Sequence, residues 1–336
     1  MFYFRIDVGP KFGLGHLTRV KALIRYLKIR SYKIVIDKLF NNNFLANDKN
    51  IVCLYKNDEK FKNELSDAKL FAKLIINKKN SKVIIDSYRI GFKWEKYISK
   101  FCKKIITIDD YVDRKHYSDI YINHSPSFLN KNFFDNINLK KFNKNSCKFL
   151  LGPDYALFNS VVDKKQYNTD IVFYNGGSGN PLIYRNIINS LLKIDNNLNI
   201  SLIIGPYASK YKTIINQLKE IKNLDLIIHP NNILNIINGT KIFISSAGIS
   251  IFESSFLKTP TLLFKMNSNQ NLNVKDYEKL GHFFCLNKND LKLTKKISEL
   301  ILLMLNNLKE ITKMMNSSNL KLRKIKKRYQ QDLKIN

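Results

Sequence analysis

The stretch FRIDVGPKFGLGHLTR, residues 4–19, decides the fold of this chain. Residues 1–6 predict a β-strand, and the apolar positions spaced three and four apart beyond residue 16 predict an amphipathic helix. The loop between them contains three glycines and ends at a histidine. Glycine leaves room for a ligand, and the N–H groups of a helix N-terminus attract an anion such as a diphosphate. An imidazole beside that anion is suited to proton transfer, so these residues predict a site for activated-phosphate chemistry.

The glycines alone do not decide between a ligand site and a structural turn. The segment lacks the third glycine of the dinucleotide fingerprint and the Gly-Lys-Ser/Thr ending of a P-loop. Charged residues on both sides favour the ligand site, because a purely structural turn has no need of them. The candidate residues of this loop are Arg5, Asp7, Gly13, Gly15, His16 and Arg19.

Length and composition point to two well-packed domains. The chain has 336 residues, of which 44% are hydrophobic. It has no apolar run of about 18 residues, so we expect no membrane span, and residue 1 leads directly into a strand, so we expect no signal peptide. The four cysteines are widely spaced and form no Cys-x-x-Cys pair, which argues against a zinc site or a disulfide framework and indicates a cytoplasmic protein.

The net charge of +30 suggests nucleic acid as a partner. However, lysine is spread along the whole chain together with asparagine and isoleucine, which indicates a drift in composition more than a designed patch. The densest run, residues 321–328, fits a solvated helix end at the C-terminus. We therefore expect no nucleic-acid partner, although the charge favours anionic substrates.

Short apolar runs alternate with helical patterns throughout the chain, as in βαβ units with parallel sheets. The first half predicts strands at 1–6, 32–36, 82–86, 104–110, 119–123 and 148–153, and the second half at 170–174, 200–204, 225–228, 241–244 and 261–264. A polar stretch at 162–170 is the best linker candidate. The simplest architecture is two similar α/β halves facing one another, with domains at 1–160 and 161–320 and a basic helical tail at 321–336.

Polar residues follow several predicted strands of the first half. Asp86, Asp109, Asp110 and Asn123 stand where ligands gather in a parallel sheet, beyond the carboxyl ends of the strands. An Asp at a strand end is as often a helix cap or a turn former.

Two loops of the second half carry glycines and serines at the same kind of position. The strand at 171–174 leads into Asn-Gly-Gly-Ser-Gly, where Gly176, Gly177 and Ser178 can donate hydrogen bonds to a phosphate. The strand at 241–244 leads into a serine-rich loop that contains Gly248 and Ser250. Helix capping alone would explain those serines. Glu253 lies in the first turn of the next helix, where a carboxylate accepts hydrogen bonds from a ribose diol.

These motifs together resemble the UDP-2,4-diacetamido-2,4,6-trideoxy-β-L-altropyranose hydrolase family of pseudaminic acid biosynthesis. The resemblance covers residues 1 to 290 and is strongest at Arg-x-Asp followed by Gly-x-Gly-His-x-x-Arg. Further matches are Ile-Ile-Asp-Ser-Tyr at 84–88, Ile-Asp-Asp at 108–110, Gly-Pro-x-Tyr-Ala-Leu at 152–157, the two loops of the second half, and Asn269-Gln270.

The family implies a GT-B fold, with two Rossmann-like domains facing across a cleft, and a cytoplasmic hydrolase without metal or cofactor. His16 resembles the catalytic histidine, with Asp7 to orient the imidazole or the water, and Asp86 and Tyr88 near the sugar. The two loops of the second half, with Asn269 and Gln270, would bind the UDP-sugar. Arg5 and Arg19 would neutralise phosphate charge. We expect the chain to act as a monomer.

The sequence departs from the family at one loop. The family has Gly-Gly-x-Thr where this chain has Ala-Gly-Ile-Ser at 247–250, which keeps a hydroxyl but loses one glycine. The basic tail also extends beyond the usual end of the family.

Three other functions stay open. A GT-B glycosyltransferase needs the same UDP site and the same base, and differs in passing the sugar to an acceptor instead of water. A nonenzymatic basic protein would bind nucleic acid in a salt-sensitive way and ignore UDP. A UDP-sugar epimerase is a weaker third candidate, because we expect a different set of acids and histidines in its sequence.

Overall fold

Two parallel β-sheets, each in a unit of its own, make up the computed structural model. It describes residues 1–39, 45, 48–56, 58–129, 146–162, 168–208, 211–266, 276–277, 283–316 and 322–333. The first unit comprises residues 1–12, 16–157 and 324–336, and the second comprises 13–15 and 158–323.

The first unit has a seven-stranded parallel sheet with the order β3-β2-β1-β4-β5-β6-β7. Its strands are β1 (Phe2–Ile6), β2 (Tyr32–Ile36), β3 (Ile51–Cys53), β4 (Lys82–Asp86), β5 (Lys104–Ile108), β6 (Ile120–Asn123) and β7 (Lys148–Leu151). The strand order reverses between β1 and β4. In open α/β sheets, ligands bind beyond the carboxyl ends of the strands at such a switch point.

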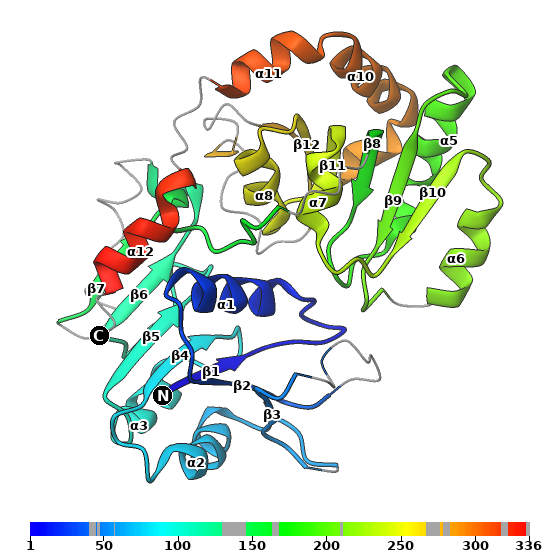
Figure 1. Ribbon diagram of the computed structural model, residues 1–336. Helices are drawn as coiled ribbons and strands as arrows, with labels where there is room; N and C mark the ends of the chain where they lie inside the picture. Colours follow the sequence, from blue (N-terminus) through cyan, green and yellow to red (C-terminus); the bar gives the residue numbers. More distant parts are fainter. Residues whose placement is uncertain are drawn as a thin grey trace. The chain divides into compact units, whose positions relative to one another are not determined.

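Helices cover both faces of this first sheet (Figure 1). Helices α2 (Glu64–Ile75) and α3 (Phe92–Ile98) pack on one face, where Phe71 and Trp94 meet the strand residues Tyr3, Val83 and Ile85. Helices α1 (Gly15–Tyr26) and α12 (Ile325–Leu333) lie on the other face. Alternate side chains of each strand therefore enter two different apolar layers, as the pleat of a strand requires.

The last helix belongs to the first unit. Tyr329 of α12 is fully buried, its ring lies 6.0 Å from that of Tyr26 at the end of α1, and its hydroxyl donates to the carbonyl of Tyr155 at 2.6 Å. Gln330 Nε2 donates to the carbonyl of Tyr26 at 2.8 Å. Helix α12 thus holds the C-terminal end of α1 in place.

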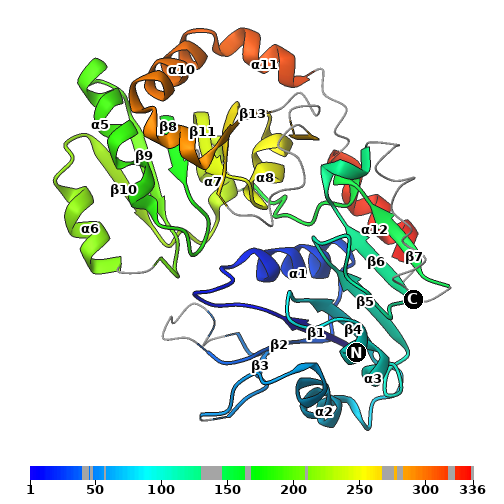
Figure 2. The same cartoon turned by 180° about the vertical axis from the view of Figure 1, so that it is seen from behind.

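The second unit repeats the same topology with six parallel strands in the order β10-β9-β8-β11-β12-β13 (Figure 2). They are β8 (Thr169–Tyr174), β9 (Ile200–Ile204), β10 (Leu224–Ile228), β11 (Thr240–Ser246), β12 (Thr261–Lys265) and β13 (Phe283–Asn287). The helices are α5 (Arg185–Ile194), α6 (Tyr211–Lys219), α7 (Ile233–Asn238), α8 (Ser250–Leu257), α10 (Thr294–Asn306) and α11 (Leu308–Asn316). The switch point of this sheet lies between β8 and β11.

The core of the second unit also has two layers. Ile171 and Phe173 of β8 face the layer that α5 and α10 cover, whereas Val172 and Tyr174 face α7. A strand buried on both faces favours apolar residues at successive positions, as residues 171–174 show.

Two strands escape the sequence analysis, β3 and β13. Both stand at the edges of their sheets. An edge strand is covered less completely, and β3 is only three residues long with an exposed Cys53. Strand β3 therefore lacks the long apolar run that reveals a central strand, whereas β13 does carry one, Phe-Phe-Cys-Leu at 283–286, and the sequence analysis missed it. In the part of the chain that the structure describes, no helix is long and apolar enough to cross a membrane.

A buried carboxylate ties β1 to helices α2 and α3. Asp67 of α2 is fully buried and accepts hydrogen bonds from Arg5 Nε at 3.2 Å and Nη2 at 2.6 Å. It also accepts from the hydroxyl of Tyr55 at 2.7 Å and from Trp94 Nε1 at 2.7 Å. Burial lowers the pKa of Arg5, but Asp67 and Asp37 outweigh burial and raise it above its usual value, so the guanidinium stays charged.

Asp67→Asn should therefore destabilise the first unit. The substitution leaves the charge of Arg5 buried with a weakened partner, and breaking such a pair costs about 3–5 kcal/mol. Urea unfolding followed by circular dichroism measures the loss. Glu299→Gln is the matched control, because the Lys295–Glu299 pair is exposed on both sides and contributes at most about 1 kcal/mol. Equal losses in the two variants would contradict this view of the Asp67 contacts.

Candidate functional site

The candidate site lies at the carboxyl edge of the first sheet, at its switch point. His16 is the second residue of α1 and is 2% exposed. Its Nδ1 lies 2.5 Å from Oδ1 of Asp86, the last residue of β4. Because a carboxylate only accepts, this contact favours a proton on Nδ1 and a lone pair on Nε2, which is the arrangement of a general base. Arg19 Nη2 lies 2.9 Å from the same Nδ1.

Arg19 lies one turn further along α1 and binds two carboxylates. Its Nε donates to Oδ2 of Asp86 at 2.9 Å, and its Nη1 donates to both oxygens of Asp110 at 2.6 and 2.8 Å. Burial raises the pKa of Asp86, but Arg19 and His16 outweigh burial and leave that pKa below its usual value. Asp86 is therefore an anion beside the imidazole and stabilises a positive charge that forms on it.

Tyr88 and His124 complete this cluster. The hydroxyl of Tyr88 donates to Asp110 at 2.5 Å, and the Tyr88 ring meets the His16 ring edge-on with centroids 4.6 Å apart. His124 follows β6, and its Nε2 lies 3.6 Å from Asp110. Burial lowers the pKa of His124 to about 4, although Asp110 acts in the opposite direction, so this imidazole is neutral at pH 7. The sequence analysis missed His124, although it directly follows Asn123, which was noted at a strand end.

Asp7 does not take the expected place beside the imidazole. Its carboxylate accepts hydrogen bonds from Ser87 Oγ at 2.8 Å and from the backbone of Tyr88 at 3.0 Å, and it binds Arg89. The carboxylate that orients His16 is Asp86. The reason is geometric, because β4 is the parallel neighbour of β1 and ends level with it, with Ile6 opposite Asp86.

The side chain of Arg5 is buried and paired with carboxylates, so it is not open to a ligand. Its side chain points to the face of the sheet that α2 and α3 cover, where Asp67 and Asp37 bind it, and it is 1% exposed. The expected role of Arg5 in neutralising a phosphate is therefore not supported by its contacts. Arg19, in contrast, lies within the cluster around His16.

Gly13 and Gly15 of the first loop differ in backbone conformation and in the space around them. Gly13 has φ of +70°, a backbone conformation that favours glycine. Gly15 is the first residue of α1, and a Cβ added there would meet no heavy atom of the described residues within 4 Å. Gly13 therefore shapes the turn, whereas Gly15 opens space at the N-terminus of the helix.

At the carboxyl edge of the second sheet, three loops meet near the switch point. Gly176, with φ of +78°, and Gly177 follow β8, and the loop after β9 approaches them so closely that a Cβ on Gly205 would lie 2.5 Å from the carbonyl oxygen of Gly177. Tyr207 N donates to that carbonyl at 2.9 Å. Ser178 belongs to the first of these loops. Gly205 was not singled out from the sequence, and Gly-Pro directly after a buried strand was its signal.

The third of these loops follows β11 and leads into α8. Ser250 Oγ, at the start of α8, lies 3.2 Å from Ser245 Oγ. Glu253, in the first turn of α8, is 4% exposed. Burial and the charge of Glu253 raise the pKa of Tyr174, which places this carboxylate beside the end of β8. Among the described residues, a Cβ added to Gly248 would meet one heavy atom within 4 Å, the carbonyl oxygen of Ser246 at 3.9 Å. Asn269 and Gln270 lie outside the described residues.

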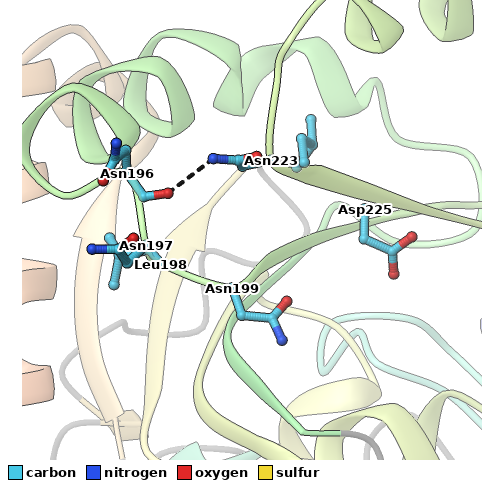
Figure 3. A pocket seen from close by; sticks show the side chains of 7 residues that line it. Asn196, Asn197, Leu198, Asn199, Asn223 and Asp225 are labelled. Atoms are coloured by element: carbon cyan, nitrogen blue, oxygen red, sulfur yellow. Dashed lines mark hydrogen bonds between the residues drawn. The ribbon is translucent and has the colours of Figure 1, made fainter.

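The described residues also line a hollow on the opposite edge of the second sheet. Figure 3 shows this hollow of about 520 Å³ at the amino ends of β9 and β10. It is lined by Asn196, Asn197, Leu198, Asn199, Asn223, Leu224 and Asp225. The residues of the candidate site do not line it. Among the described residues, no three His, Cys, Asp or Glu side chains are placed to hold a metal ion.

Residues 171–329 match the glycosyltransferase family 28 C-terminal domain. A protein of Methanocaldococcus jannaschii described as uncharacterized is 26% identical over 299 residues, which cover 81% of this chain. The match covers 57% of that relative, so the chain spans little more than half of its length.

Solved structures with similar folds include nucleotide-sugar enzymes. The UGT89C1 of Arabidopsis thaliana complexed with UDP has a TM-score of 0.63 at 10% identity and covers 98% of both chains. The MurG of Acinetobacter baumannii has a TM-score of 0.60 at 10% identity, covering 98% of this chain and 99% of that one. The UDP-GlcNAc 2-epimerase of M. jannaschii has a TM-score of 0.54 at 14% identity, covering 100% and 99%. The fold is of the GT-B class. The expected fold class, two Rossmann-like α/β domains with parallel sheets, is confirmed.

Gly205→Ala should disrupt the carboxyl edge of the second sheet. The new methyl group would lie 2.5 to 2.7 Å from backbone atoms of residues 176 and 177, so one loop must move. We expect a loss of about 1–3 kcal/mol of stability, as for other overpacked sites, measured by urea unfolding. Gly248→Ala is the matched control on the neighbouring loop, where the methyl group has space, and it should change stability by less than the Gly205 substitution. A reversed order would contradict the packing described here.

Proposed function

We propose that this chain is a nucleotide-sugar hydrolase that removes UDP from a UDP-linked sugar by attack of water at C1. The observation that carries the proposal is the buried His16–Asp86 pair at the switch point of the first sheet. The match of residues 171–329 to the glycosyltransferase family 28 C-terminal domain supports a nucleotide-sugar ligand.

The two units have different tasks in this proposal. The edge of the second sheet binds UDP through the loops of Gly176 to Ser178 and Gly248 to Ser250, whose N–H and hydroxyl groups suit a diphosphate. Glu253 accepts hydrogen bonds from the ribose. The edge of the first sheet supplies the base, with Arg19 and Tyr88 holding its surroundings.

The chemistry follows from the state of the imidazole. His16 Nε2 takes a proton from water as the water oxygen forms a bond to C1, and the bond from C1 to the diphosphate oxygen breaks. The electron pair of that bond goes to UDP, whose charge the N–H groups of the second unit stabilise. Asp86 stabilises the imidazolium that forms. Base assistance of this kind contributes about 10²–10⁴-fold to the rate.

The substrate class comes from the resemblance in the motifs. We propose a UDP-linked 2,4-diacetamido-2,4,6-trideoxy hexose, consumed in the cytoplasm during pseudaminic acid biosynthesis. The substrate-binding residues proposed from the sequence include Gly13, Gly15 and, beyond the described residues, Asn269 and Gln270.

His16→Asn should lower kcat for UDP release by about 10²–10⁴-fold, because the variant has no base. Asp86→Asn should also lower kcat, by up to about 10⁴-fold, because the imidazole loses the anion that orients it and stabilises the imidazolium. Asp48→Asn is the matched control. Among the described residues, Asp48 forms an ion pair only with Lys21, a surface lysine, at 3.5 Å. UDP release is measured with purified full-length protein and a panel of UDP-sugars, without any acceptor.

UDP affinity separates chemistry from binding in the same variants. Calorimetric titration with UDP should give the same Kd for wild type, His16→Asn and Asp86→Asn, because the proposed UDP-binding residues lie in the other unit. Turnover retained by His16→Asn would refute the role of this imidazole.

The second candidate function is a glycosyltransferase, which the family 28 match favours. The same base would then take its proton from an acceptor hydroxyl. UDP release that depends on an added acceptor would decide for the transferase, and release in water alone would decide for the hydrolase.

A further inference from the structure

A further buried histidine, His116, lies next to the candidate site, between two carboxylates. His116 is 1% exposed, its Nδ1 lies 2.8 Å from Oε1 of Glu95, and its Nε2 lies 2.9 Å from Oδ2 of Asp109. Glu95 is on α3, and Asp109 directly follows β5. The histidine therefore bridges a helix on one face of the sheet to the carboxyl end of a central strand.

Both ring nitrogens of His116 face a carboxylate, so both must carry a proton to hydrogen-bond. A neutral imidazole has one N–H and would set a lone pair against one of the two anions. The cluster is also balanced in charge, because Arg114 lies 3.2 Å from Asp109 and adds a second cation to the two anions. The geometry thus calls for an imidazolium inside the protein.

The cluster continues directly into the candidate site. The other oxygen of Asp109 accepts from the backbone of Tyr111 at 3.1 Å, so the backbone on both sides of Asp110 is fixed. Asp109 N also donates to the carbonyl of Ile122 on β6 at 3.0 Å. Asp110 is the residue that binds Arg19 and Tyr88, and these two contact Asp86 and His16.

We propose that His116 is a positioning residue for the proposed reaction, whose charged ring holds Asp109 and thereby sets Asp110 against Arg19 and Tyr88 beside the His16 base. The proposal rests on the proposed function for its effect on turnover. It concerns a group that touches neither sugar nor nucleotide.

The protonation of His116 gives this arrangement a pH limit. The groups that face it are Glu95 from α3, Asp109 from β5, Tyr121 from β6 and Arg114 from the loop between them. Burial raises the pKa of Tyr121 well above its usual value, so that ring stays neutral. Burial lowers the pKa of His116, but Glu95 and Asp109 outweigh burial and raise it from 6.5 to about 9.

The raised pKa of His116 determines how the stability of the folded state depends on pH. Because the pKa is raised in the folded state, the stabilisation from the charged ring is complete below pH 6.5 and is lost as the pH rises through about 9. The same rise should release Asp109 and disturb the site at Asp110.

Nitrogen-15 NMR of the histidine rings in the full chain tests the proposal without substrate. In the wild type, we expect His116 to titrate near pH 9 and the His16 ring signals to shift with that same midpoint. In Glu95→Gln, which removes one of the two carboxylates, both midpoints should fall by about 1–3 pH units. Glu64→Gln is the matched control, because Glu64 of α2 accepts a hydrogen bond from the backbone N–H of Trp94 at the start of α3, at 3.0 Å. It should leave both midpoints unchanged.

Turnover provides the second measurement. We expect kcat for UDP release to fall roughly tenfold one pH unit above the His116 midpoint, with KM unchanged, and this limb should move with the midpoint in Glu95→Gln. His16 signals that stay constant while His116 loses its proton would overturn the proposal, and the wild type alone decides this if Glu95→Gln does not fold. Linked midpoints without UDP release from any UDP-sugar would support the positioning role and refute the proposed function.

Discussion

The site depends on one buried carboxylate, that of Asp86. A lone anion inside a protein is very costly, and Asp86 is 1% exposed. It is tolerated because α1 brings Arg19 and His16 to its two oxygens, at 2.9 and 2.5 Å. Arg19 is buried as well, so its positive charge in turn needs the carboxylates of Asp86 and Asp110. The N-terminal turn of α1 and the carboxyl ends of β4 and β5 are therefore fixed relative to one another by charge.

The fold could be predicted from the sequence to a large extent, because central parallel strands are buried on both faces. Residues 83–85 and 171–174 stand out as apolar runs for this reason, and β4 and β8 form there. The edge strand β3 is half covered and left no such signal. The ends of the central strands can also be located from the sequence, which identifies Asp86 and Asp110 as candidate site residues.

The partners of those residues could not be predicted, because pairing depends on which neighbours the sheet order creates. Asp7 and Asp86 are both acids at strand ends, and nothing in the chain order says which one meets His16. The sequence also does not tell to which face of the sheet the Arg5 side chain points, because a shift of one residue along a strand moves a side chain to the opposite face. His124 and His116 looked like isolated histidines, since their carboxylate partners come from other elements.

The two sheets have the same strand order around the switch point, but different types of residue lie at their carboxyl edges. The first has ionic groups at its switch point, with Asp86, Asp110 and Arg19 in contact. The second has glycines and hydroxyls there, and the carbonyl of Gly177 packs against Gly205. An edge of backbone groups can surround a large anion closely, whereas an edge of fixed charges can hold one imidazole in a defined state.

The position of α12 bears on how the chain reaches its native state during translation. The first unit is completed by residues from the C-terminal end of the chain, whose Tyr329 fills the space beside Tyr26 and Tyr155. A ribosome therefore has to release the whole second unit before the first can acquire its last helix. Until then, Tyr26 at the end of α1 and Tyr155 lack the Tyr329 ring that packs against them.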